Sequence, residues 1–73
     1  MKIIINDSVY EMTKQQAEKT IKVASQYVPF GIYAVEKDGI IELRKDKCKT
    51  PKHLKQLKAD FIKKGFRVYC NEH

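Results

Sequence analysis

The hydrophobic pattern of the chain changes period several times, and each change marks the edge of a predicted element. A β-branched run at 2–5 stops at Asn6-Asp7, and apolar residues return after it, which is typical of a β-hairpin with a polar turn. A second hairpin is predicted where Asp38-Gly39 separates the apolar runs 32–36 and 40–44, because both turn positions require positive φ. The two hairpins account for four strands.

A helical pattern follows the first hairpin. Thr13 and Gln16 have the spacing of a capping box, so a helix should begin at Lys14. Apolar residues then recur every three or four positions, which is typical of an amphipathic helix packed on one side. Pro29 and Gly31 are expected to end it.

A second helix is predicted over about 51–64, after the second hairpin. Thr50 is the expected cap, proline stands at the first helical position, and Gly65 is the expected stop. From Phe66 onward apolar and polar residues alternate, which predicts a final strand with one face on the core. The order of elements is therefore ββαββαβ.

This order predicts an α+β fold in a single domain, residues 1–73. We expect two layers, with both helices on one face of a mixed or antiparallel sheet of about five strands. The connection through the second helix suits a right-handed crossover. That crossover would make the strand ending near Arg44 parallel to the strand from Phe66.

The distribution of charge along the chain indicates the kind of partner that the protein binds. The net charge is +6, and ten of the fifteen Lys and Arg residues lie between Arg44 and Arg67, where only Asp46 and Asp60 oppose them. That segment has a net charge of 10 − 2 = +8, and the rest of the chain sums to −2. Such a one-sided distribution predicts an anionic partner.

The candidate contact surface is the loop 44–50 together with the helix 51–64. The free N–H groups after Thr50 and the positive end of the helix dipole favour an anion. Lysines on one flank of the helix extend the surface over about 16 Å. The candidate phosphate-binding residues are Arg44, Lys45, Lys47, Lys49, Lys52, Lys55 and Lys63.

Aromatic residues on the strands suggest a second feature. If Asp38-Gly39 closes a two-residue loop, Tyr33 pairs with Arg44 and both point away from the apolar face, as do Arg67 and Tyr69. An outer face that is aromatic and basic can stack bases in a positive groove. The other explanation is that strands favour Tyr and that Lys keeps a small protein soluble.

We therefore expect a non-enzymatic binding module that contacts nucleic acid, DNA or RNA, with weak sequence preference. The alternative is a small inhibitor or adaptor that presses the same positive surface against an acidic protein. The sequence does not separate the two functions, and it leaves the oligomeric state open.

A zinc site formed by the cysteines and histidines is not expected, although the sequence alone leaves zinc binding open. Cys48, His53, Cys70 and His73 form two pairs, but their spacing is not that of a standard zinc finger and nearby lysines repel a cation. No cofactor is expected. Cys70 is expected to be a small core residue and Cys48 a loop thiol, without a bridge between them. His53, the residue on which RNA cleavage would depend, is expected on a solvated helix flank.

The start of the chain indicates location. The three-Ile run at 3–5 is too short for a signal-peptide core or a membrane span, so a cytoplasmic protein without membrane contact is expected. The segments Lys-Ile-Ile-Ile-Asn at 2–6, Tyr-Glu-Met at 10–12 and Lys-Gly-Phe-Arg-Val-Tyr at 64–69 resemble short orphan proteins of phages or mobile elements of Gram-positive bacteria. The resemblance implies a DNA-transaction accessory or an inhibitor of host defence, and it assigns no functional residue.

Overall fold

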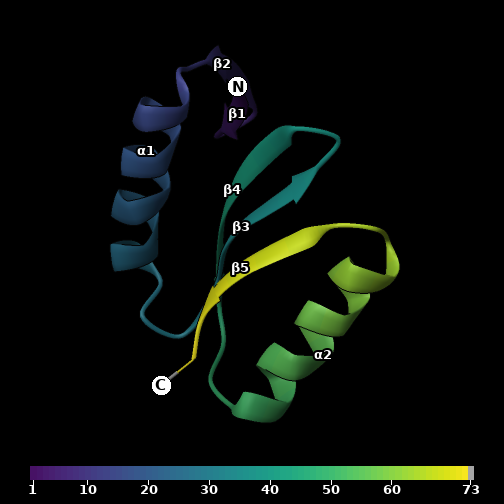
Figure 1. Ribbon diagram of the computed structural model, residues 1–73. Coiled ribbons are helices and arrows are strands. Elements are labelled where there is room, and N and C mark those ends of the chain that lie inside the picture. The colour runs from purple at the N-terminus through teal and green to yellow at the C-terminus, as the bar shows by residue number, and fades with distance from the viewer. Residues whose placement is uncertain (73) are drawn as a thin grey trace.

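The computed structural model describes residues 1–72 and contains seven elements in the predicted order (Figure 1). They are β1 (Lys2–Ile5), β2 (Ser8–Glu11), α1 (Lys14–Tyr27), β3 (Gly31–Lys37), β4 (Ile40–Lys47), α2 (Pro51–Lys63) and β5 (Arg67–Asn71). The expected α+β class, with five strands and two helices, is confirmed. None of the helices in residues 1–72 is long and apolar enough to span a membrane.

Both hairpins turn through the residues that the sequence singled out. Asp38 and Gly39 have φ angles of 54° and 77°, and Lys37 pairs with Ile40 directly across the turn. Asn6-Asp7 closes the first hairpin in the same way, with φ angles of 49° and 68°. Two consecutive residues of positive φ match the right-handed twist of the flanking strands.

Side-chain caps set the helix ends. Gln16 N–H donates to the Thr13 hydroxyl at 3.2 Å, and Thr13 N–H donates to the Gln16 side-chain oxygen at 3.1 Å, so the capping box before α1 is complete. Thr50 caps α2 by accepting from His53 N–H at 3.2 Å. Gly65, at φ 90°, ends α2, because glycine adopts this conformation without a steric penalty.

The sheet is mixed, with the strand order β2-β1-β4-β3-β5. β1 pairs with β4 in parallel, and the other pairs are antiparallel. β4 and β5 both pair antiparallel with β3, so they run in the same direction on either side of it, as the crossover through α2 predicted.

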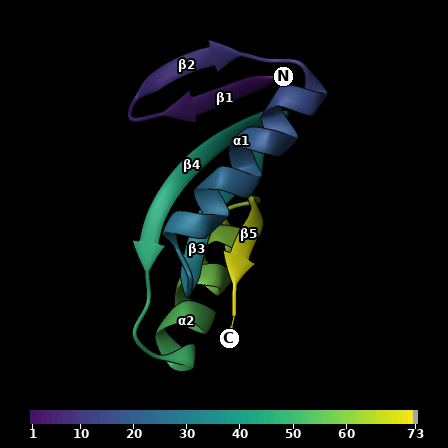
Figure 2. The ribbon, with the colours of Figure 1, turned by 90° about the vertical axis from the view of Figure 1, so that its left-hand side faces the viewer.

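The two helices cover opposite faces of the sheet, so the expected two-layer arrangement with both helices on one face is wrong. Ala34 and Val35 are neighbours in β3 and point to opposite faces, yet both are fully buried. Ala34 packs in the core cluster that contains Ala17 of α1, and Val35 packs in the cluster that contains Leu54 of α2. In Figure 1 the two helices flank the strands, and in Figure 2 α1 lies in front of them.

The physical reason for three layers lies in the central strand. Ile32, Ala34 and Val35 are all 0% exposed, so β3 has no solvent-facing side over this stretch. A strand that is apolar on both faces needs cover on both. The α1 cluster is built from Ile3, Ala17, Ala34 and Ile41, and the α2 cluster from Ile32, Val35, Cys48 and Leu54.

Candidate anion-binding surface

Arg44 is held by groups within its own sheet. Its Nη1 lies 3.2 Å from a Glu42 carboxylate oxygen, its Nε donates to the Asp46 carboxylate, and its guanidinium carbon lies 4.9 Å from the centre of the Phe61 ring. The hydrogen bond to Asp46 is the main cause of a raised pKa of Arg44. This cation is therefore neutralised before any ligand arrives, and it is not part of the open basic surface.

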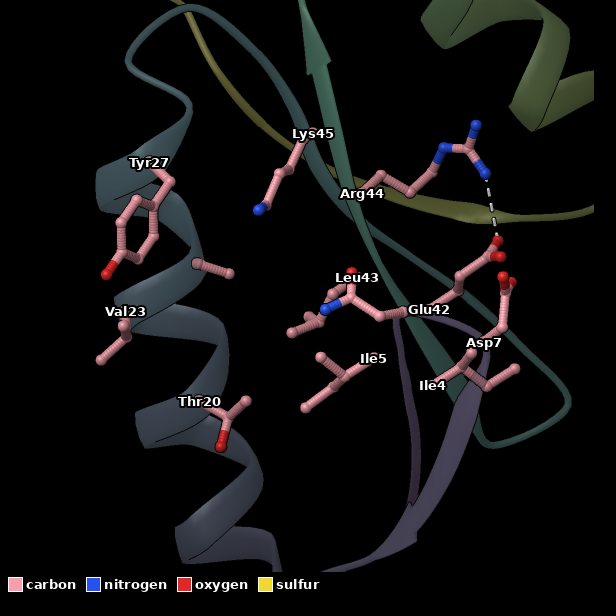
Figure 3. Close-up of a pocket in the computed structure, with 12 residues that line it drawn as sticks. Ile4, Ile5, Asp7, Thr20, Val23, Tyr27, Glu42, Leu43, Arg44 and Lys45 are labelled. Atoms are coloured by element: carbon pink, nitrogen blue, oxygen red, sulfur yellow. Dashed lines mark hydrogen bonds and ion pairs between the residues drawn. The ribbon is translucent and has the colours of Figure 1, made fainter.

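Lys45 lies on the other side of the sheet from α2. It follows Arg44 in β4, and successive side chains of a strand point to opposite faces. Its side chain extends toward Tyr27 of α1, whereas Arg44 points the other way (Figure 3). Lys45 thus does not join the lysines of α2, and the predicted contact set does not form one continuous surface.

Three lysines remain together on the solvent side of α2. Lys52, Lys55 and Lys63 are exposed, and 100° steps place them opposite the side that carries Leu54 and Phe61. None of the three takes part in an ion pair within residues 1–72. We call Lys52, Lys55 and Lys63 the lysine row; its two ends are 63 − 52 = 11 residue steps apart, or about 16 Å at about 1.5 Å per step.

The start of α2 adds uncompensated positive charge to the row. Lys47 and Lys49 precede the helix and are exposed, and neither takes part in an ion pair within the described chain. The first turn of α2 contains no acidic residue, so nothing there offsets the positive end of the helix dipole. Lys47, Lys49, Lys52 and Lys55 therefore lie before or within the first turns of a helix terminus that favours an anion, and Lys63 extends the positive charge to the last turn of α2.

The predicted aromatic and basic face forms only in part. Tyr33 and Tyr69 lie with their ring centres 6.3 Å apart, and the Arg67 guanidinium carbon is 5.3 Å from the Tyr69 ring centre. Both rings pack against the α1 cluster, on the face away from Arg44. The Tyr69 hydroxyl donates to Glu36 at 2.8 Å, and burial is the main cause of its raised pKa.

An irregularity in the pairing of β3 explains why Tyr33 and Arg44 lie on different faces of the sheet. The pairing of β3 with both neighbours shifts register between Ile32 and Ala34. The expected pair of Tyr33 with Arg44 does not form, because a bulge re-aims the side chain at that position. Tyr33, Arg67 and Tyr69 instead line a shallow groove of about 550 Å³ beside α1.

Cys48 lies in the loop between β4 and α2, as predicted, but its side chain is buried in the core. It is 8% exposed in the α2 cluster, and burial raises the pKa of its thiol. Cys70 is half-buried against the same cluster, and both cysteines are free. His53 is exposed on α2, as expected. The fourth candidate zinc ligand, His73, lies outside the described residues, and no three His, Cys, Asp or Glu side chains in residues 1–72 gather around a common point.

A groove that was not predicted from the sequence lies between α1 and β4. Its volume is about 630 Å³, and Val23 and Tyr27 of α1 face Leu43 and Lys45 of β4 across it (Figure 3). Val23 is 50% exposed and Tyr27 63%. The available signal was that both side chains lie beside, and not in, the apolar stripe of α1. We call this feature the α1–β4 groove. Its lining includes Ile5, Val23, Ala24, Tyr27, Leu43 and Lys45, together with the charged residues Asp7, Glu42 and Arg44.

The charged side chains of residues 1–72 lie at the surface, and none is buried in the interior. No polar or charged residue among 1–72 is buried, and the thiol and phenol groups with shifted pKa values are shifted toward their neutral forms. Comparison with protein-family models, curated proteins and solved structures finds no match. What the surface offers chemically is attraction for a negatively charged partner.

Proposed function

We propose that the protein is a small, non-enzymatic binding module that neutralises nucleic-acid phosphates with the lysine row of α2, assisted by Lys47 and Lys49. One observation carries the proposal: these exposed cations have no ion-pair partner in residues 1–72. Lysine contacts to phosphate release condensed counterions, and this term is independent of base sequence. Weak sequence preference follows from it.

Two residues of the predicted phosphate-binding set, Arg44 and Lys45, are not part of the proposed contact surface. Arg44 is paired with Glu42 and Asp46, and Lys45 faces α1 (Figure 3). Residues 44–47 belong to β4 and not to a loop as the sequence predicted, so the connecting segment is 48–50. The proposed contact surface is therefore the end of β4 at Lys47, this segment and the exposed side of α2. Tyr33, Arg67 and Tyr69 form a separate feature on the α1 face of the sheet.

The alternative function is that of an inhibitor or adaptor whose lysine row meets an acidic protein surface. The same unpaired lysines support it, because charge complementarity sets the on-rate and the partner. Both functions suit a cytoplasmic protein, and both agree with the resemblance to phage and mobile-element proteins. Pull-down from nuclease-treated lysate separates them, since a protein partner survives nuclease and a nucleic-acid bridge does not.

Salt-dependent binding to mixed oligonucleotides tests the proposal. If all five lysines contact phosphates, the slope of log affinity against log salt should be about −3.5 on single strands and about −4.5 on duplex DNA, at about 0.7 and 0.9 per contact. Each single Lys→Ala change in the row should reduce the slope by one contact.

Two matched variants sharpen this test. Ala59 is exposed and lies on the same side of α2 as the lysine row, so Ala59→Lys should steepen the slope by about 0.7 to 0.9. Lys19→Ala removes an exposed lysine from α1 and should leave the slope unchanged. Absence of binding to single- and double-stranded DNA and RNA at low salt would refute the proposal.

A further inference from the structure

The edge of β4 that faces β1 is only partly used. β1 pairs with β4 over Ile40–Glu42, whereas β4 runs to Lys47. Beyond Glu42, residues 43–47 have β3 on one side, and on the other side no strand within residues 1–72. Such an interrupted edge presents backbone N–H and C=O groups to any extended chain beside it.

The direction of these backbone groups follows from the pairing. Cys48 N–H donates to the Phe30 carbonyl at 2.9 Å on the β3 side. Backbone polar groups alternate between the two sides of a strand, so Lys45 and Lys47 direct their N–H and C=O groups to the open edge. An added strand would find two residues ready to form ladder hydrogen bonds.

The α1–β4 groove lies beside this open edge. Leu43 and Ile5 form its sheet side, and Val23 and Tyr27 form its helix side (Figure 3). Half or more of the Val23 and Tyr27 side chains is exposed, which is costly in an empty groove and favourable once an apolar side chain covers them. A strand laid along β4 would direct alternate side chains into this space.

Charge selects the kind of strand. Lys45 extends toward α1 within the groove (Figure 3). Glu42 also lines the cavity, but its carboxylate is paired with Arg44, and Asp7, in the turn between β1 and β2, is the other acidic residue of the lining. Lys45 and Lys47 make no ion pair with any residue from 1 to 72. A segment with carboxylates next to its apolar residues would therefore complement this edge.

We propose that an extended, acidic segment of a partner protein adds to the open edge of β4 as a sixth strand. It places an apolar side chain among Val23, Tyr27 and Leu43 and a carboxylate at Lys45. Main-chain hydrogen bonds supply affinity and the groove supplies selectivity, as in other cases of strand addition. The lysine row lies on α2, which covers the other face of the sheet, and Lys47 is shared by the two proposals, so variants of Lys45 and Lys52 are used to separate them.

Fluorescence polarisation with a designed peptide tests the proposal. The probe is a labelled eight-residue peptide in which valine alternates with glutamate, and the comparison peptide has lysine in place of each glutamate. The wild-type protein should bind the acidic peptide at least about tenfold more tightly than the basic one, because like charges at Lys45 and Lys47 oppose the second. Backbone amide NMR shifts should concentrate at 43–47.

Charge reversal at Lys45 and a negative charge placed in the groove at Val23 provide the variants. Lys45→Glu should weaken the acidic peptide about tenfold and strengthen the basic one, and Val23→Asp should abolish binding of the acidic peptide. Val23 is exposed enough that the second variant should still fold, which circular dichroism checks. Lys52→Glu, in the lysine row, is the matched control and should leave peptide binding unchanged while weakening nucleic-acid binding.

Several outcomes would overturn the proposal. They are equal binding of the two peptides, unchanged binding by the Lys45→Glu variant, and peptide-induced shifts confined to α2. Protection of 43–47 by self-association in the absence of peptide would assign the edge to a second copy of the chain. Shifts at 43–47 caused by oligothymidine and not by the acidic peptide would assign it to nucleic acid.

Discussion

Replacing Arg44 with alanine is expected to destabilise the fold and to leave nucleic-acid binding intact. The Arg44 side chain is 32% exposed, and its partners Glu42 and Asp46 are 39% and 28% exposed. Ion pairs at such partly solvated positions contribute about 0.2–1 kcal/mol each. The guanidinium over Phe61 adds about 0.5–1 kcal/mol.

The sum of these contributions is about 1–3 kcal/mol. A domain of 73 residues has a free energy of unfolding of about 4–11 kcal/mol, so the loss is a substantial fraction of it. Urea unfolding followed by circular dichroism measures the change. Because the ion pairs are screened by salt, the difference between the wild type and the Arg44→Ala variant should shrink in 1 M sodium chloride, a salt in which the Debye length is about 3 Å.

Lys52→Ala is the comparison variant, since Lys52 is exposed and makes no ion pair within residues 1–72. It should change stability by less than about 0.5 kcal/mol and should lower the salt slope of nucleic-acid binding. The reasoning is refuted if the two variants behave the other way round. An Arg44→Ala protein of unchanged stability and reduced salt slope would return Arg44 to the contact surface.

Three further predictions concern the rest of the fold. Gly31→Ala should cost more than about 3 kcal/mol, because a Cβ at this position, with φ 144°, would lie 2.1 Å from the Asp46 carbonyl oxygen; a variant with wild-type urea midpoint would contradict this. The free energy of unfolding should fall above about pH 9, because the pKa values of Cys48, Cys70 and Tyr69 are raised in the native state. The native protein then keeps protons that the unfolded chain releases, and each group lowers the free energy of unfolding by at most about 1.4 kcal/mol per pH unit. Urea titrations at pH 7 to 10 measure this change, and a rise in stability over that range would contradict the prediction. Cys48 should react with a disulfide reagent much more slowly than Cys70 in the native protein and equally fast in urea, and equal native rates would show that Cys48 is not buried.

Local signals in the sequence predicted most of the secondary structure. Asp38-Gly39 and the capping box of Thr13 and Gln16 act over a few residues, so they could be identified without knowledge of the tertiary structure. Gly65 marked the end of α2 for the same reason. These features depend on φ preferences and on hydrogen bonds between near neighbours.

Features that depend on long-range packing were harder to predict. The helices lie on opposite faces because β3 is buried on both sides, with Ile32 and Val35 on one face and Ala34 on the other. In the sequence this double burial is visible only as a continuous apolar run. The bulge at Tyr33 left no pattern in the sequence, and it changed which side chains share a face.

The candidate site was predicted in part. The positive charge of residues 44–67 was visible in the sequence. The sequence did not show that these cations would be distributed over different faces of the fold. The alternation Glu42-Arg44-Asp46 on one side of a strand was the available sign that Arg44 would find carboxylates of its own. The lysine row could be predicted, because helical periodicity alone places Lys52, Lys55 and Lys63 on one side of α2.

The most direct test of the central claim is the salt dependence of oligonucleotide binding by a variant in which all three lysines of the row are replaced by alanine. The affinity of the wild type should fall linearly with salt on logarithmic axes, and the triple variant should have a slope shallower by about 2.1 to 2.7, three contacts at about 0.7 to 0.9 each. An unchanged slope in the triple variant would show that α2 does not face the nucleic acid and would contradict the account.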